Sequence, residues 1–327
     1  MSGAPSTGRQ ASTAALDAAW TIVLATSRAA AAASEVSGHQ AYALSPDGDL
    51  FAVETDDDRA VVAWRDGQGW ESTLAATDPR QALVELYLPI TSGTPARPLT
   101  IGHLGQSLDG FIATPSGESQ FVTGEENILH LHRMRALCDA VIVGAGTVAA
   151  DDPQLTTRKV PGPNPLRVVL DPSRRLAVHY KIFTDDSADT LYICTERLVA
   201  AGETHFGRAT IRAVADVPNG MDAAAVLALL RARGCHRIFV EGGGVTVSMF
   251  LQADLLDRLQ VATAPLIIGN GRPAIRLPAR DALSECRRPR YRVFRMGGDV
   301  FFDCDLRDLG AGPEDGADDL PLLTRII

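Results

Sequence analysis

The sequence has few of the residues that mark metal-binding, disulfide-linked or membrane-spanning proteins. Its five cysteines are scattered, without a Cys-x-x-Cys pair: Cys138, Cys194, Cys235, Cys286 and Cys304. Such spacing excludes a zinc ribbon and is typical of reduced thiols in a cytoplasmic protein. No apolar run reaches the roughly 18–20 residues of a membrane span, and the first residues lack the basic and apolar regions of a signal peptide. We therefore expect a soluble, cytoplasmic protein without a metal site.

Positive charge is also scarce. The 31 lysines and arginines are outnumbered by 40 aspartates and glutamates, which gives a net charge of −9. General nucleic-acid binding needs a basic surface, so this balance argues against it. Arginines gathered in particular loops could still hold a phosphorylated small molecule. The length of 327 residues, 46% of them hydrophobic, allows one large or two ordinary domains.

The first part of the chain reads as a small α+β domain of unknown function, over residues 16–90. Residues 1–15 are small and polar, and we expect them to be disordered. The elements predicted next are a helix at Leu16–Val36, a hairpin around Ser45–Asp49, a strand at Ala60–Trp64 and an amphipathic segment at Pro79–Leu88. Residues 91–98 are a linker by composition.

From residue 99 to 306, strands alternate with helices, and residues 307–327 form an acidic, glycine-rich C-terminal tail. Thr123 and Glu126 suggest a capping box that opens a helix ending at Leu137. Further helices are predicted at Asp222–Arg233 and Thr246–Leu259, and two strands surround a Gly-Gly-Asp turn near residue 298. This order predicts an α/β fold with a mixed, mainly parallel sheet flanked by helices and an antiparallel edge.

The stretch VIVGAGTVAADDPQLTT, Val141–Thr157, reads as the floor of an active site. A buried strand delivers two glycines and the neighbouring acids Asp151 and Asp152 to one edge of the sheet, where open α/β sheets bind ligands. One acid serves as a turn residue in the plain interpretation, and the other is a proton donor or acceptor. The spacing from Gly144 also matches the dinucleotide motif GxGxxG/A, but Pro153 leaves too short a helix for it.

A second glycine turn, Glu241–Thr246, lies between a strand and a helix. Three successive glycines let a backbone approach a phosphate closely, and the N–H groups at the helix start then point at the anion. An ordinary strand-to-helix turn usually manages with one glycine. We therefore favour a ligand-binding turn over a purely structural one.

Several arginines could hold an anionic ligand: Arg133, Arg135, Arg158, Arg174 and Arg175. Most are solvated surface residues by default. Arg158 is the best candidate because it follows the acid pair by a short segment and is expected to face the same rim. His130 and His132 are spaced wrongly for metal ligands on one helix face, so we interpret them as surface or packing residues.

Five motifs in order resemble one enzyme family. They are SLDG (Ser107–Gly110), GESQ (Gly117–Gln120), VGAGTVAADDPQLT (Val143–Thr156), RVVLD (Arg167–Asp171) and VEGGG (Val240–Gly244). The likeness is to the reductase half of the bifunctional riboflavin-pathway pyrimidine deaminase/reductase, the RibD C-terminal domain, and to its free-standing archaeal relatives. It covers about residues 98–306. The resemblance implies a dihydrofolate-reductase-like fold, NADPH as reductant and a homodimer.

The resemblance also implies site residues. Those on the substrate side are Ser119, Arg135, Leu155, Arg158 and Glu241, with the serine and arginines around a phosphate. Those on the cofactor side, together with the two glycine turns, are Gly105, Phe121, Gly144, Gly146, Thr147, Asp151, Ser173, Gly242, Gly243, Gly244, Val245 and Thr246. Asp151 is expected to be the catalytic group, and Arg174, Arg175 and Arg197 are candidates for the cofactor's 2′-phosphate.

The activity implied by the resemblance is NADPH-dependent reduction of a ribosylaminopyrimidine 5′-phosphate to its ribitylamino product. Hydride adds to C1′ after the sugar ring opens, and Asp151 is the group expected to supply a proton. Three alternatives remain open from the sequence. These are reduction of a pterin, folate or specialised-metabolism pyrimidine by the same fold, a non-catalytic nucleotide sensor, and a scaffold that binds no cofactor.

Two departures from the family bear on function. Residues 1–96 contain no cysteine and no His-x-Glu, so the zinc deaminase of the bifunctional enzymes is not expected in this chain. In addition, His103 stands where many relatives have lysine. The charge of a lysine there is permanent, whereas that of a histidine depends on pH. This leaves open whether the substrate pyrimidine carries an amino or an oxo group.

Overall fold

The computed structural model describes residues 7–217 and 220–307. The chain divides into two units, Met1–Pro98 and Leu99–Ile327, each with its own core. None of the described helices combines the length and apolar character that crossing a bilayer requires.

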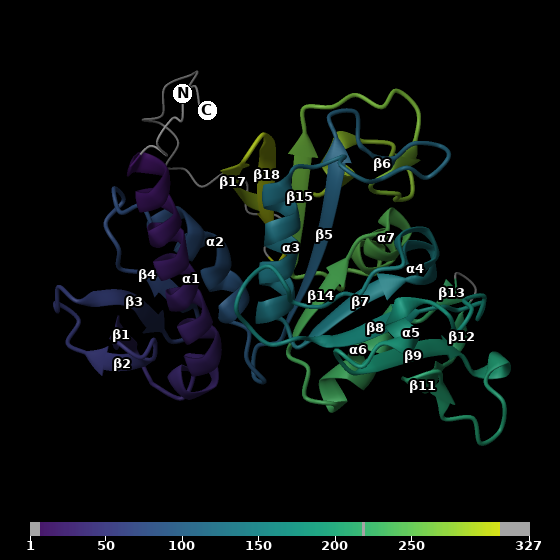
Figure 1. The fold of residues 1–327 in the computed structure, drawn as a ribbon, viewed down its shortest axis with the longest axis horizontal. Helices are drawn as coiled ribbons and strands as arrows, with labels where there is room; N and C mark the ends of the chain where they lie inside the picture. Colours follow the sequence, from purple (N-terminus) through teal and green to yellow (C-terminus); the bar gives the residue numbers. More distant parts are fainter. Residues whose placement is uncertain (1–6, 218–219, 308–327) are drawn as a thin grey trace, which may run out of the picture. The chain divides into compact units, whose positions relative to one another are not determined.

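The first unit pairs two helices with a four-stranded antiparallel sheet in the order β2-β1-β3-β4 (Figure 1). Its elements are α1 (Thr7–Ala33), β1 (His39–Leu44), β2 (Leu50–Val53), β3 (Ala60–Arg65), β4 (Gly69–Ser72) and α2 (Gln81–Thr91). The predicted hairpin is confirmed, because Leu44 pairs with Leu50 across the Asp-Gly turn.

Aromatic side chains form much of the core of this unit. The Trp20 ring meets Tyr87 edge-on at 5.7 Å, and Trp64 meets Trp70 in the same way at 5.1 Å. All four are buried. Edge-to-face packing suits the charge distribution of aromatic rings. The three tryptophans of the chain therefore all lie in the first unit.

The first helix starts earlier than the sequence analysis predicted. Helix α1 begins at Thr7, within the segment expected to be disordered up to residue 15. Alanine, the strongest helix former, recurs through the first turns and extends the helix towards the N-terminus. Residues 1–6 lie outside the described residues, as does the tail from residue 308 on.

The second unit is built on a ten-stranded sheet in the order β10-β11-β9-β8-β7-β14-β5-β15-β18-β17. Its strands are β5 (Leu99–Ser107), β7 (Ala140–Gly144), β8 (Leu166–Leu170), β9 (Thr190–Thr195), β10 (His205–Phe206), β11 (Ala209–Val214), β14 (Arg237–Glu241), β15 (Arg258–Ala264), β17 (Arg290–Met296) and β18 (Asp299–Asp305). Its helices are α3 (Glu125–Leu137), α4 (Ala145–Asp151), α5 (Lys181–Thr184), α6 (Ala223–Ala232), α7 (Gly244–Gln252), η1 (Glu196–Leu198) and η2 (Leu283–Glu285). Two short ribbons pair β6 (Phe111–Ala113) with β16 (Arg272–Pro273), and β12 (Asp216–Val217) with β13 (Gly220–Met221).

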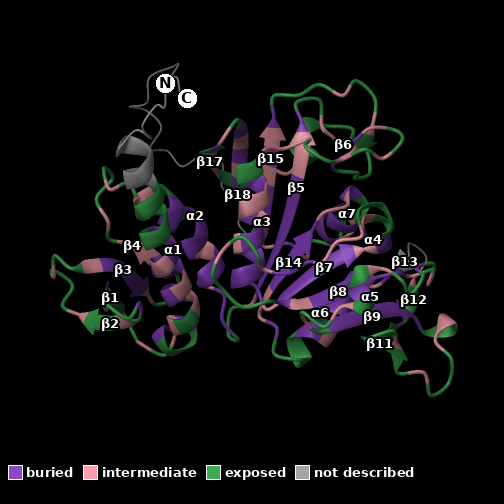
Figure 2. Cartoon of the chain, viewed as in Figure 1, coloured by how far each residue is buried: buried purple, intermediate pink, exposed green. Residues whose placement is uncertain are grey.

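Seven neighbouring strands, from β11 to β15, are parallel, and antiparallel strands close both ends of the sheet. The central strands are almost wholly buried (Figure 2). Burial on both faces is what their continuous apolar runs predict. The expected mainly parallel sheet with an antiparallel edge is confirmed.

Two predicted helix boundaries are wrong. Helix α3 begins at Glu125 with Gly124 as its N-cap, and the Thr123 hydroxyl accepts a hydrogen bond from Asn127 instead of capping the helix. Helix α7 ends at Gln252 rather than Leu259. Asp254 takes a left-handed conformation at φ 56°, and Arg258 then starts β15 beside Ile101. Sheet pairing therefore overrides the helical periodicity of this stretch.

Candidate active site

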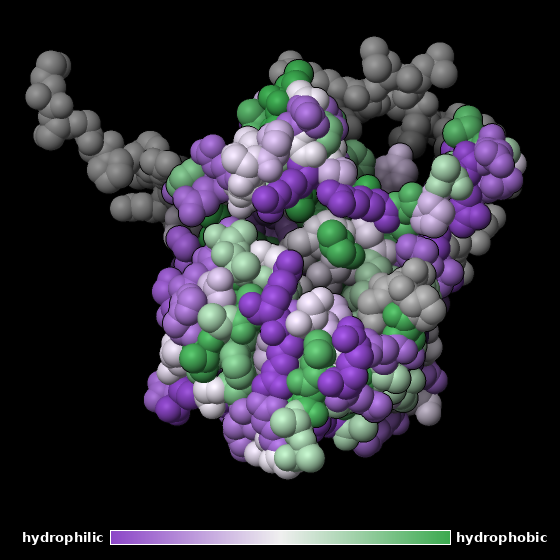
Figure 3. Space-filling view, turned by 90° about the vertical axis from the view of Figure 1, so that its right-hand side faces the viewer, coloured by the Kyte–Doolittle hydropathy of each residue, from purple (hydrophilic) through white to green (hydrophobic). Residues whose placement is uncertain are grey.

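A cavity of about 620 Å³ opens at the carboxyl ends of β7, β8 and β14. Strand β14 is inserted between β7 and β5, and a reversal of strand order of this kind is where α/β sheets bind ligands. Figure 3 views the second unit from this side, where hydrophilic residues border a central hollow. The cavity lining includes thirteen of the predicted site residues: Gly105, Ser119, Gly144, Gly146, Thr147, Asp151, Ser173, Glu241, Gly242, Gly243, Gly244, Val245 and Thr246.

The triple-glycine turn takes a conformation and a packing that require glycine. Gly242 and Gly243 both have φ 69°. A Cβ on Gly243 would lie 2.9 Å from the Thr147 hydroxyl, and one on Gly244 would lie within 2.6 Å of two backbone carbonyls. Among the described residues, no side chain caps the start of α7. Its first N–H groups are thus available to an anion in the cavity.

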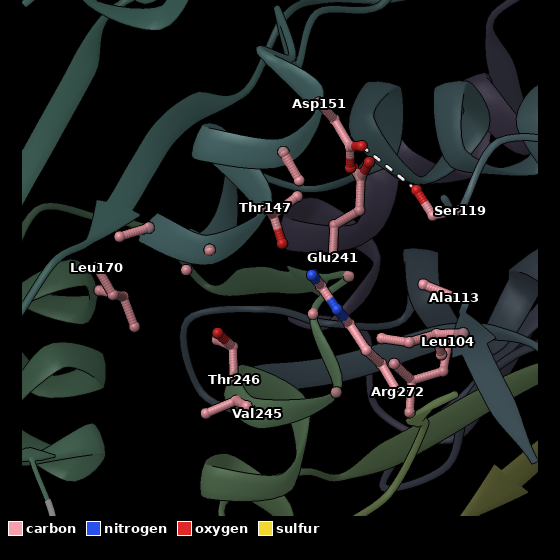
Figure 4. Close-up of a pocket in the computed structure, with 18 of the residues that line it drawn as sticks. Leu104, Ala113, Ser119, Thr147, Asp151, Leu170, Glu241, Val245, Thr246 and Arg272 are labelled. Atoms are coloured by element: carbon pink, nitrogen blue, oxygen red, sulfur yellow. Dashed lines mark hydrogen bonds between the residues drawn. The ribbon is translucent and has the colours of Figure 1, made fainter. Parts of the chain in front are cut away.

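The two neighbouring acids have different environments. Asp151 is the last residue of α4, lines the cavity and accepts a hydrogen bond from Ser119 at 3.3 Å (Figure 4). Partial burial raises the pKa of Asp151, against the opposing effects of the Ser119 hydroxyl and the Arg272 charge. Asp152 caps α4 at φ 42°, and its carboxylate accepts a bond from the Lys181 backbone N–H at 2.7 Å. Asp151 is therefore the chemical candidate and Asp152 the structural one.

Glu241, at the end of β14, is held by Arg135 of α3. The guanidinium donates two hydrogen bonds to the carboxylate, one of them at 2.8 Å, and both side chains are at least 90% buried. Arg135 itself is not among the cavity-lining residues. Because charges are rarely buried unpaired, Arg135 fixes Glu241 as a negative group in the cavity wall.

Arg158, predicted to face the cavity rim, also lies outside the lining. Its backbone N–H donates to His132 Nδ1 at 3.0 Å. Burial lowers the pKa of the Arg158 guanidinium, and repulsion from Arg135 adds to this. Burial together with Arg135, Arg158 and Lys159 lowers the pKa of His132 to about 4. The three positive charges thus lie close to His132, and a bound anion would reduce the electrostatic repulsion among them.

Phe121 and Leu155 also lie outside the cavity lining. Both have a positive φ, 66° for Phe121 and 54° for Leu155. Phe121 is 84% exposed, whereas Leu155 is buried. A left-handed conformation is uncommon for such residues and is kept only where the surroundings impose it.

His103, in the middle of β5, is buried and lines the cavity. Within the described part of the chain, neither ring nitrogen has a hydrogen-bond partner of normal geometry. Burial lowers the pKa of His103 well below 6.5, and His130 lowers it further, whereas the nearby Asn127 opposes this. The imidazole is therefore neutral. His130 and His132 are buried as well, so they are packing residues rather than surface residues.

A family comparison decides what this arrangement belongs to. The model of the RibD C-terminal domain matches residues 98–292, which contain the whole cavity lining. The chain belongs to the RibD C-terminal domain family. The family model thus covers most of the second unit and begins at the boundary between the two units.

Members of the RibD family resemble this chain to different extents. The 2,5-diamino-6-ribosylamino-4(3H)-pyrimidinone 5′-phosphate reductase of Methanothermobacter thermautotrophicus is 32% identical over 218 residues, covering 63% of this chain and 97% of that protein. The protein of the same name from Archaeoglobus fulgidus is 31% identical over 205 residues, covering 58% of this chain and 91% of that protein. The riboflavin biosynthesis protein RibD of Aquifex aeolicus is 30% identical over 212 residues, 64% of this chain but 58% of that protein.

Solved structures of RibD proteins share the fold. The deaminase/reductase of Thermotoga maritima matches with a TM-score of 0.54 and 26% identity, over 69% of this chain and 61% of that one. RibD of Acinetobacter baumannii matches with a TM-score of 0.55 and 25% identity, over 70% of this chain and 63% of that one. The chain thus spans less than two-thirds of these longer RibD proteins, and the dihydrofolate-reductase-like fold is confirmed.

Three arginines that line the cavity, Arg175, Arg272 and Arg276, have no side-chain partner among the described residues. Arg276 donates a hydrogen bond only from its backbone, to the Ser248 hydroxyl at 2.8 Å. Arg175 was named from the sequence, but Arg272 and Arg276, which both follow the last parallel strand of the RibD domain, were not. The signal for Arg272 was weak: a single arginine between Gly271 and Pro273.

Proposed function

We propose that this protein is an NADPH-dependent reductase of a ribosylaminopyrimidine 5′-phosphate in a riboflavin-type pathway. One observation carries the proposal: a single cavity holds the glycine turn and α7 start on one side and Asp151 with Ser119 on the other. A dinucleotide and a second ligand therefore have a place to meet. The names of the two archaeal relatives and of the RibD proteins support the same reaction.

The residues present fit a nicotinamide dinucleotide. The turn at Gly242 and Gly243 leaves room that any Cβ at Gly243 would fill, and the start of α7 suits a pyrophosphate. Arg175 suits the 2′-phosphate that distinguishes NADPH from NADH. Arg174 is bound to Glu203, and Arg197 is bound to Asp216, so Arg175 is the better of the three candidates.

The substrate side carries positive charge that suits a 5′-phosphate. The cations Arg135, Arg158 and Lys159 all lie near His132, Arg135 and Arg158 repel each other, and a 5′-phosphate would offset this positive charge. Ser119 and Glu241 offer a hydroxyl and a carboxylate to the sugar and the base. Holding the sugar and base in this way orients C1′ for reaction. Orientation alone can lower the activation free energy by several kcal/mol.

When bound, NADPH supplies a hydride from its dihydronicotinamide ring. In the substrate, opening of the ribose ring gives a C1′=N double bond; a new C1′–H bond forms and the electron pair of the double bond moves to nitrogen. Asp151 then gives its proton to that nitrogen and becomes a carboxylate. The raised pKa of Asp151 favours the protonated form that this step needs.

Substrate-dependent oxidation of NADPH tests this proposal. Turnover of the amino or oxo form of the ribosylaminopyrimidine phosphate is expected, and comparing the two identifies the preferred form. Turnover of dihydrofolate or a dihydropterin alone would favour another reductase of this fold. Binding of NADPH without turnover of any of these would indicate a sensor, and absence of binding would contradict a cofactor site altogether.

Two further features complete the proposal. We infer that the enzyme is a homodimer, as the family resemblance implies, and light scattering of the purified chain tests this. We also infer that it works in the cytoplasm: all five cysteines are free, and three of them are buried. Fractionation of cells that express the chain tests the second inference.

A further inference from the structure

Arg272 occupies an unusual place in the cavity. It belongs to β16, which pairs with β6 through Arg272 and Ala113. The residues after it pack directly on the glycine turn, since a Cβ on Gly244 would lie 2.6 Å from the Pro273 carbonyl oxygen and 2.4 Å from that of Ala274. Strand β16 therefore holds the base of the arginine side chain next to the first residue of α7.

The other end of the side chain reaches across the cavity. A Cβ on Gly117 would lie 2.6 Å from one guanidinium nitrogen of Arg272, so the tip rests against the loop that carries Ser119. Figure 4 shows its nitrogen atoms directed into the space between Thr246 on one side and Asp151 and Ser119 on the other. The positive charge of Arg272 reaches Asp151 as well, where it opposes the rise in the pKa of that carboxyl.

The guanidinium is available for a ligand. No ion pair or hydrogen bond joins it to any other residue of the described chain, although its charge lies in a cavity. Two carboxylates of the cavity lining have other partners: Asp151 accepts a hydrogen bond from Ser119, and Glu241 accepts one from Arg135. An arginine kept unpaired in a pocket offers a planar set of donors that matches phosphate oxygens.

We propose that Arg272 binds the pyrophosphate of the dinucleotide from the side opposite the start of α7. The helix N–H groups can reach only one side of an anion held at the glycine turn, and the guanidinium supplies the other. This inference rests on the proposed function and adds a cofactor-binding residue to it. Arg272 and Arg175 then divide the cofactor between them, because pyrophosphate is common to NADPH and NADH and the 2′-phosphate is not.

Direct binding of NADPH and NADH, followed by nicotinamide fluorescence without substrate, tests the inference. R272Q should raise the dissociation constants of NADPH and NADH by the same factor, about ten-fold or more, as loss of a charge-assisted hydrogen bond predicts. R272K should restore part of the loss. R175Q should weaken NADPH alone. R280Q, at an exposed arginine of the same segment outside the cavity lining, should leave both constants within about two-fold.

The outcomes separate this inference from the proposed function. Unchanged dissociation constants of both nucleotides in R272Q would overturn the assignment of Arg272 to the pyrophosphate. A rise in the substrate KM alone would also overturn it, because the guanidinium would then bind the substrate. A wild-type chain that binds neither nucleotide would instead refute the proposed function. Because Arg272 has no partner to lose, R272Q should melt within about 2 °C of the wild type. A changed melting temperature would trace the effect to folding and count against a binding role.

Discussion

Arg135 on α3 and Glu241 at the end of β14 are 106 positions apart in the chain, and they form a doubly hydrogen-bonded, buried ion pair whose carboxylate lines the cavity. The pair joins a helix on the face of the sheet to the strand that leads into the glycine turn. A ligand that enters the cavity thus meets a carboxylate whose position is already set.

Breaking this pair should destabilise the second unit. E241Q leaves the Arg135 charge buried without a counter-charge, and the free energy of unfolding should fall by about 3 kcal/mol, measured by urea denaturation. D216N, which breaks the exposed pair between Arg197 and Asp216, is the control and should change it by less than about 1 kcal/mol. Equal effects of the two variants would show that the buried pair is not a structural element.

Replacing Asp151 and Asp152 by asparagine should affect different properties of the protein, turnover for Asp151 and stability for Asp152. D151N removes the proposed proton donor, so turnover should fall by about 100-fold or more while NADPH affinity stays within a few-fold. D152N weakens the contact with the Lys181 backbone and should lower stability with little loss of turnover at saturation. Steady-state kinetics and cofactor titration measure both. Unchanged turnover in D151N would remove Asp151 from the mechanism.

The pH dependence of turnover should follow Asp151. Proton transfer from Asp151 to the substrate nitrogen needs the protonated carboxyl. The rate should therefore fall as the pH rises through the pKa of Asp151, which lies above the usual value of 3.8. S119A removes a hydrogen bond that lowers this pKa, and the falling limb should therefore move to higher pH. A pH–rate profile of S119A that coincides with that of the wild type would argue against Asp151 as the titrating group.

Acid should destabilise the fold through buried His130. Burial lowers its pKa to about 3, against the hydrogen bond with Gln260, whereas the unfolded histidine titrates near 6.5. Between these values the unfolded chain binds a proton that the folded chain does not, so stability is lost as pH falls below 6.5. H130Q should lessen the slope by about 1.4 kcal/mol per pH unit, measured by urea denaturation between about pH 4 and 5.5, where the unfolded histidine is protonated and the folded one is not. An unchanged slope would contradict a neutral, buried His130.

The sequence was sufficient for the architecture and for most of the cavity. Apolar runs such as Ala140–Val143, together with the glycines that follow Glu241, carry enough local information to predict strands and the turn between them. The convergence of Asp151 and the Gly242–Gly244 turn on one cavity, predicted from their places at strand ends, is confirmed. The roles of the individual residues stay predictions.

Tertiary contacts account for what was missed. Arg158 was expected on the cavity rim, but its backbone is tied to His132 and its side chain lies outside the lining. The helix after the glycine turn ends early because Arg258 joins the sheet. Arg272 was not predicted as a site residue. It lies near the glycine turn because β16 pairs with β6, and this pairing produces no periodic pattern in the sequence.

The placement of the tryptophans has a practical consequence for spectroscopy. Trp20, Trp64 and Trp70 all pack inside the first unit. Tryptophan fluorescence therefore reports the unfolding of the first unit and does not report that of the second unit, which holds the candidate active site. Far-ultraviolet circular dichroism records both halves. Coincident transitions from the two signals would mean that the two units unfold cooperatively. Separate midpoints would give the stability of each unit without any mutation.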